Sequence, residues 1–259
     1  MNRVAERFQE LKRAGRKAFI PYIMGGDPDL PRLPRILESL AATGVDLIEV
    51  GVPFSDPLAD GPVIQAAGQR ALRHGCTLTK LLTALKPVAS SLPVPLLLMI
   101  YYNQIFQRGT ARFLEEVKAA GGAGLIIPDL PPEAAGELSR LAADFEISLN
   151  FLVAPTSQAE RIRMVATAST GFVYTVSVKG VTGAREQLPP ELPAFVQRVK
   201  TLSPRPVAVG FGIATPDQAR MVSRLADGVV VGSAIVQAIA EDTELKKMAS
   251  LVKALREAI

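Results

Sequence analysis

Short runs of branched aliphatic residues recur along the chain, and segments with helical periodicity separate them. Eight such runs, each expected to form a strand, lie at Ala18–Met24, Leu47–Pro53, Pro95–Tyr102, Gly124–Asp129, Ser148–Ala154, Gly171–Val176, Pro206–Gly210 and Gly228–Val231. Aliphatic strands that alternate with helices form parallel sheets buried under those helices. The alternation predicts either a closed barrel of eight strands or an open doubly wound sheet.

The chain length, and the lack of a dominant glycine-rich dinucleotide motif, favour the barrel over the open sheet. The 259 residues are close to the roughly 250 that a (β/α)₈ barrel typically needs, and no dominant dinucleotide fingerprint follows the first strand. We therefore predict an α/β protein, a single (β/α)₈ TIM barrel over residues 1–259 without a domain boundary. An extra N-terminal helix is expected because Val4, Phe8 and Leu11 recur at helical spacing.

Two later helices carry start signals. Ser157 with Glu160, and Thr215 with Gln218, have the spacing of a capping box, and Pro216 follows the second candidate cap. Both pairs predict helices that begin directly after a strand.

Charge and cysteine content exclude several classes of function. The formal net charge is +4, with Lys and Arg scattered among acids, so nucleic-acid binding is not expected. The longest apolar run, Val94–Tyr102, is far shorter than the roughly 20 residues that cross a bilayer. A single cysteine, Cys76, and a single histidine leave few metal ligands, and a reducing cytoplasm is the expected location.

Glu49 interrupts an otherwise apolar strand. Alternation along the run turns Ile48 and Val50 toward the outer helices and Glu49 toward the barrel interior. A buried carboxyl without a partner acquires a raised pKa, which suits proton transfer near neutral pH, although a structural acid is equally consistent with the pattern. Asp56 and Asp60 follow in a turn-rich loop, where each could instead cap the next helix.

Glycine pairs end the last two predicted strands, in Gly210-Phe211-Gly212 and Gly232-Ser233. Many barrels hold a phosphate at these two loops, using backbone N–H groups and a helix N-terminus. The coincidence favours a phosphate site over two simple turns. Gly180-Val181-Thr182-Gly183, after the sixth predicted strand, could contribute a further amide or act as a hinge. His74 and Cys76 are expected to be a helix cap and a buried structural thiol.

Several of these runs together resemble the signatures of tryptophan synthase alpha chains, and the similarity extends over essentially the whole chain. The matching runs are Leu47 to Pro62, Gly180 to Gly183, Val209 to Ile213 and Val231 to Val236. The chain departs from the family pattern at Gln104, where many relatives have Pro, and at Gly25, which replaces a commoner Ala.

The resemblance implies a role for each candidate site residue. It implies that Glu49 and Asp60 are the catalytic pair and that Tyr174 lines the site. The other implied residues are Tyr22, Met99 and Ile126 for the indole pocket, and Gly183, Gly212, Gly232 and Ser233 for the substrate phosphate. It also implies no metal or cofactor in this chain, because pyridoxal phosphate belongs to a partner beta chain.

The implied reaction is retro-aldol cleavage of indole-3-glycerol phosphate to indole and glyceraldehyde 3-phosphate. The implied assembly is alpha-beta-beta-alpha, with contacts through Pro53–Asp60 and Lys179–Pro189. We expect these two segments to form a mobile mouth that orders when ligand or partner binds. The alternatives are another phosphate-binding barrel enzyme of the same pathway and a mainly regulatory subunit.

Overall fold

The parallel sheet has the strand positions that the aliphatic runs predict. The computed structural model describes residues 2–176, 188–210 and 212–259. Its strands are β1 Ala18–Met24, β2 Ile48–Gly51, β3 Leu96–Met99, β4 Gly122–Ile126, β5 Ser148–Leu149, β6 Leu152–Val153, β7 Val173–Val176, β8 Val207–Gly210 and β9 Gly228–Val231. Every pairing is parallel, in the order β5-β4-β3-β2-β1-β9-β8-β7-β6.

The sheet closes on itself through the fifth predicted strand. β5 and β6 stand at opposite ends of the strand order, yet only Asn150 and Phe151 separate them in the chain. The Asn150 N–H donates to the Leu125 carbonyl at 3.0 Å, and the Phe151 carbonyl accepts from the Tyr174 N–H at 3.0 Å. One continuous segment therefore bonds to both of its neighbours. The prediction of a (β/α)₈ barrel is confirmed, and the open sheet is excluded.

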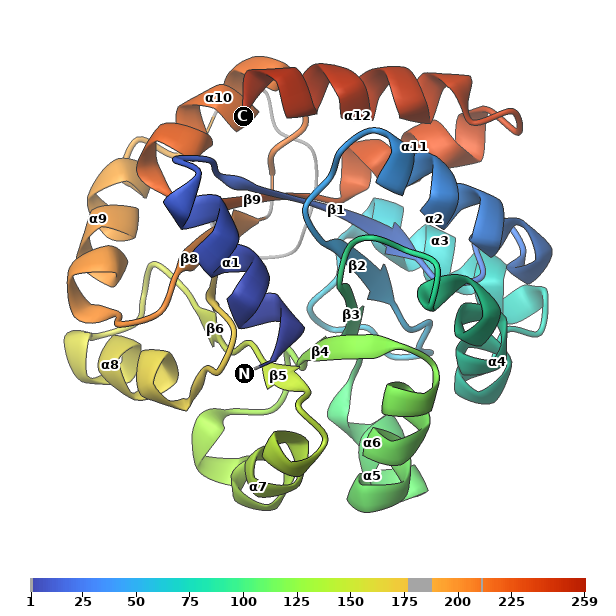
Figure 1. Cartoon of the computed structure of the whole chain (residues 1–259), viewed down its shortest axis with the longest axis horizontal. Coiled ribbons are helices and arrows are strands. Elements are labelled where there is room, and N and C mark those ends of the chain that lie inside the picture. The colour runs from blue at the N-terminus through green and yellow to red at the C-terminus, as the bar shows by residue number, and fades with distance from the viewer. Residues whose placement is uncertain (1, 177–187, 211) are drawn as a thin grey trace.

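Helices surround the barrel on all sides (Figure 1). They are α1 Arg3–Arg13, α2 Leu33–Ala42, α3 Pro62–Arg73, α4 Leu78–Ala89, α5 Tyr102–Arg108, α6 Thr110–Ala119, α7 Gly136–Asp144, α8 Ala159–Ala168, α9 Leu192–Leu202, α10 Pro216–Leu225, α11 Ser233–Glu241 and α12 Lys246–Ala258, with short 3₁₀ turns η1 Leu30–Arg32 and η2 Pro132–Ala134. Within the described residues, no helix combines the length and apolar character that a membrane span requires.

The two predicted caps have different outcomes. At α10, the Thr215 hydroxyl accepts a hydrogen bond from the Gln218 N–H, and the Gln218 side-chain oxygen accepts one from the Thr215 N–H, so the capping box is confirmed. At α8, the N-cap is Gln158 instead of Ser157. The Ser157 hydroxyl accepts from the Ala154 N–H at 3.1 Å. The prediction for Ser157 was wrong because a local turn uses its hydroxyl.

The extra N-terminal helix α1 lies across the N-terminal end of the barrel (Figure 1). It buries Val4, Phe8 and Leu11, the residues whose spacing predicted it. A Cβ added to Gly228, at the start of β9, would lie 3.4 Å from the Phe8 ring. Phe8 therefore packs against the barrel interior at this end.

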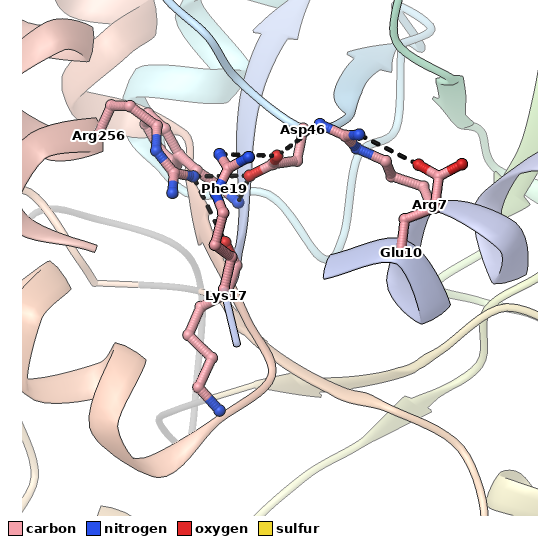
Figure 2. Close-up of polar contacts among 7 residues, drawn as sticks. Arg7, Glu10, Lys17, Phe19, Asp46 and Arg256 are labelled. Carbon is pink, nitrogen blue, oxygen red and sulfur yellow. Dashed lines mark hydrogen bonds and ion pairs between the residues drawn. The ribbon is translucent and has the colours of Figure 1, made fainter. Parts of the chain in front are cut away.

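Three arginines from distant parts of the chain converge on one buried acid at the same end (Figure 2). Asp46, just before β2, is 0% exposed. It accepts from Arg7 at 2.8 Å, Arg256 at 2.6 Å and Arg16 at 3.5 Å, and from the Phe19 N–H at 2.9 Å. Because Arg7 belongs to α1 and Arg256 to α12, this cluster fastens both terminal helices to the barrel.

Asp46→Asn should therefore lower the free energy of unfolding, measured by urea titration. Removing one partner of a buried ion pair leaves charge uncompensated and costs at least about 3 kcal/mol. We expect a loss near this lower value, because the arginines are partly exposed. The control is Asp217→Asn, since Asp217 is 90% exposed in its pair with Arg220 and should change stability by at most about 1 kcal/mol. Equal losses of stability in the two variants would show that the Asp46 cluster does not hold the terminal helices to the barrel.

Candidate active site

Glu49 lies in the middle of β2 and is 0% exposed. Its parallel neighbour on β1 is Tyr22. A Cβ added to Gly51, two residues further along the strand, would overlap the Tyr22 hydroxyl. Since residues two apart share a face of a strand, Glu49 and Tyr22 lie on the interior side of the barrel. This agrees with the orientation expected from the alternation of β2.

No described residue satisfies the Glu49 carboxyl. Both of its oxygens are buried and lack a hydrogen-bond partner in the part of the chain that the structure describes. Burial raises the pKa of Glu49 to about 8, and the negative charge of Asp60 adds to that rise. A carboxyl with this pKa is mainly protonated at neutral pH and can both donate and accept a proton there.

Asp60 lies just before helix α3, near enough to Glu49 for its charge to raise the pKa of that carboxyl. Burial raises the pKa of Asp60 to about 6, while a hydrogen bond from the Tyr101 side chain opposes the rise. The Tyr101 hydroxyl also accepts from the Ala59 N–H at 3.0 Å. Tyr101 therefore bonds both to the Asp60 carboxyl and to the backbone of the loop that carries it. The Gln65 side chain donates to the Asp60 carbonyl at 2.9 Å. Asp60 is thus a fixed carboxyl that is mainly ionised at neutral pH.

Helix α3 is itself anchored. Arg70 donates through two nitrogens to the two carboxylate oxygens of Asp27, at 2.8 and 2.9 Å. The Asp27 side chain is 2% exposed and follows β1. A bidentate pair on a buried carboxylate fixes both distance and orientation. The helix that carries Asp60 at its start is therefore tied to the loop after β1.

Tyrosine and aliphatic side chains form the walls around the two acids. Tyr22 and Tyr174 are buried, and their pKa values are raised by burial and by the charges of both Glu49 and Asp60. Met99 pairs in register with Gly51 on one side and with Ile126 on the other. Register partners in a sheet point to the same side. The predicted pocket residues thus lie together with the acids.

The predicted phosphate residues lie where β8 and β9, which are neighbours, reach the end of the barrel. Gly212 has φ +83°, a conformation that favours glycine. Gly232 is the N-cap of α11 and Ser233 its first residue, and no side chain caps that helix. A Cβ on Gly232 would lie 3.4 Å from the Tyr22 ring, so this uncapped N-terminus adjoins the tyrosine beside Glu49. Gly183 falls outside the described residues.

Other residues that the sequence analysis discussed lie away from the acids. His74 is the C-cap of α3, as expected. Cys76 is buried and free, and burial raises the pKa of its thiol to about 11. Among the described residues, no group of three or more His, Cys, Asp or Glu side chains is placed to hold a metal ion.

Two functional contacts were missed by the sequence analysis. Tyr101 lies in an apolar run where core or pocket wall is the expected role, but it bonds to the Asp60 loop and stacks on Phe54 with ring centroids 5.2 Å apart. Gln104, noted as a departure, donates to the Pro53 carbonyl at 3.4 Å. Both contacts join the loop after β2 to the segment after β3. Neither leaves a local signal, because each partner is about 40 or more residues away.

Comparison with known proteins gives a consistent family. The model of the family described as tryptophan synthase alpha chain matches residues 8–258. The tryptophan synthase alpha chain of Geobacter sulfurreducens is 48% identical over 100% of this chain and 99% of its own length. That of a Picosynechococcus species is 46% identical over 100% of both. A structure of Mycobacterium tuberculosis tryptophan synthase superposes with TM-score 0.92 and 38% identity, covering 100% of this chain and 98% of that one.

The raised pKa of Glu49 makes stability depend on pH. Between the ordinary value of 4.5 and the folded value of about 8, the unfolded chain has lost the proton that the folded chain keeps. The contribution of Glu49 to folding therefore becomes less favourable as pH rises through this interval, and is constant above it. Glu49→Gln removes the titration, so urea unfolding should show the variant gaining stability relative to wild type from pH 4.5 to 8.

Glu38→Gln, the same change at an exposed position on α2, is the matched control and should run parallel to wild type. A Glu49→Gln curve that also runs parallel to wild type would mean that the Glu49 carboxyl is not desolvated.

Proposed function

The chain belongs to the tryptophan synthase alpha chain family, and we propose that Glu49 and Asp60 carry out its reaction. Members of this family are lyases that act on indole-3-glycerol phosphate, and the chain is accordingly an alpha subunit of tryptophan synthase. The reaction cleaves the substrate to indole and glyceraldehyde 3-phosphate. The observation that supports the assignment is the buried Glu49 carboxyl, which has no hydrogen-bond partner among the described residues and lies near enough to Asp60 for the Asp60 charge to raise its pKa.

Glu49 transfers the protons. Cleavage requires a proton at C3 of the indole ring, so that the ring can accept the electron pair of the breaking C–C bond. It also requires loss of a proton from the adjacent glycerol hydroxyl as the aldehyde forms. A carboxyl with a pKa of about 8 is protonated before the reaction and can supply the first proton. The resulting carboxylate accepts the second, which returns Glu49 to its starting state.

Asp60 stabilises positive charge. When C3 is protonated, the indole ring becomes cationic and its N–H a stronger donor. An ionised carboxylate beside that N–H lowers the energy of this state. The pKa of Asp60, at about 6, is below that of Glu49, so the two acids differ in protonation at neutral pH. That difference supports one acid for proton transfer and one for charge stabilisation.

The phosphate anchors the substrate at the opposite end of the cavity. Gly212, Gly232 and Ser233, together with Gly183, offer backbone N–H groups and an uncapped helix start to the phosphate. Tyr22, Tyr174, Met99 and Ile126 enclose the indole ring. Binding at both ends fixes the reacting carbon between the acids. In this mechanism no metal or cofactor belongs to the chain, and the pyridoxal phosphate of tryptophan synthesis belongs to the beta chain.

The family implies a beta chain as partner, and we assign its contacts to the mouth of the barrel, in an alpha-beta-beta-alpha assembly. Pro53–Asp60 and Lys179–Pro189 are the contacting segments in this proposal. Support comes from the first of them, where Leu58 is 86% exposed, and from Phe106 on the adjoining α5, which is 68% exposed. Large exposed apolar side chains at one edge are typical of protein interfaces. A cytoplasmic location stays a prediction, based on the single free cysteine.

Glu49→Gln should abolish indole formation from indole-3-glycerol phosphate, while calorimetry shows the substrate still bound. An amide keeps the shape of the side chain but cannot exchange the protons, and general acid–base catalysis contributes roughly 10²–10⁴-fold by itself. Asp60→Asn should lose most of the activity, because a neutral amide cannot stabilise the cationic ring.

Glu38→Gln is the control for both variants and should keep the wild-type rate. Substantial turnover by Glu49→Gln would remove Glu49 from proton transfer, and a normal rate for Asp60→Asn would remove Asp60 from the mechanism. A wild-type chain that forms no indole, alone or with a beta chain, would instead favour a regulatory subunit or another phosphate-dependent barrel enzyme.

A further inference from the structure

A cavity of about 460 Å³ lies at the N-terminal end of the barrel, opposite the proposed active site. Its wall is formed by the end of α1, the segment leading into β1, the end of α9 and the segment leading into β8. The lining residues are Phe8, Leu11, Lys12, Gly15, Arg16, Lys17, Lys200, Ser203, Pro204, Arg205, Pro206 and Asp227. Five of these are basic and one is acidic. The fold therefore brings together, around one cavity, Lys and Arg side chains from two distant parts of the sequence.

The basic side chains outnumber their acidic partners. Asp227 takes two of them, Lys200 at 2.9 Å and Lys17 at 3.6 Å. Lys12 and Arg205 form no ion pair with any described residue. Uncompensated like charges gathered on one surface repel, and Asp227, the acid among the lining residues, is already shared by two lysines.

Arg16 is a third available cation. Its only ion pair among the described residues is with Asp46, at 3.5 Å, and its side chain is 47% exposed. Asp46 already has shorter contacts with Arg7 and Arg256, at 2.8 and 2.6 Å. Figure 2 shows these two guanidinium groups closing on Asp46 from either side. Arg16 can therefore turn toward the cavity without leaving Asp46 unpaired.

We propose that this cavity is a binding site for a small organic anion that carries two or more phosphate charges, such as a nucleoside diphosphate. Guanidinium and ammonium groups are the donors that bind phosphates. The volume is within the 300–1,000 Å³ typical of small-molecule sites and is too large for a phosphate ion alone. Phe8, Leu11 and Pro204 supply apolar wall for the uncharged part of such a ligand.

The test is calorimetric titration of the full chain with ADP, pyrophosphate and adenosine, in buffer without divalent cations. ADP should bind more tightly than pyrophosphate, because only ADP fills the apolar part, and adenosine should not bind. The double variant Lys12→Gln/Arg205→Gln should weaken ADP binding roughly tenfold or more, since it removes two charged donors. The KM for indole-3-glycerol phosphate should stay unchanged, because this cavity and the proposed active site lie at opposite ends of the barrel.

The matched control is Arg73→Gln/Lys253→Gln, which removes the same charge from exposed positions on α3 and α12. It should bind ADP like wild type. Equal weakening in both double variants would mean that net charge alone attracts the anion. No weakening in either, or ADP that binds only in competition with indole-3-glycerol phosphate, would mean that the N-terminal cavity is not the site. Failure of the enzymatic assignment would alter only the KM measurement, and not the comparison of ADP affinities.

Discussion

The burial of one carboxyl without a partner is the constraint on which the site depends. A lone charge in a protein interior is costly, and the usual response is a raised pKa that keeps the group neutral. Glu49 meets that condition because β2 is covered by helices outside and enclosed by the barrel inside. Tyr22, Tyr174 and the apolar side chains around Glu49 are themselves buried, and the charge of Asp60 raises the pKa of Glu49 further. The barrel therefore determines the chemistry of the acid that it encloses.

The two ends of the barrel have different roles, one in stability and the other in chemistry. At the N-terminal end, Phe8 packs against the interior, and the Asp46 cluster fastens the terminal helices. Those contacts allow the other end to keep unsatisfied groups. There, Asp60 is held through its loop by Tyr101 and through α3 by the Arg70–Asp27 pair. Catalytic groups on several strand ends above a packed core are the usual arrangement in such barrels.

Sequence patterns correctly predicted the features that depend on residues close together in the chain. Alternation along β2 oriented Glu49, aliphatic runs located the strands, and the spacing of Thr215 and Gln218 identified a cap, because each depends on neighbours within a few residues. The closure at Asn150 and the contact of Tyr101 with the Asp60 loop depend on residues far away in the chain. Ser157 shows the same limit, since its competing turn could not be distinguished from a cap. Roles for Gly183 and for the Lys179–Pro189 segment stay predictions.

The protonation state of Glu49 is the most direct test of this account. The chain can be labelled with ¹³C at the glutamate carboxyls, and Glu49→Gln identifies the signal by its loss. We expect that signal to titrate with a midpoint of about 8 in the ligand-free protein. A midpoint near 4.5, the ordinary value for a glutamate, would contradict the account, because Glu49 would then be ionised at neutral pH and could not supply the first proton.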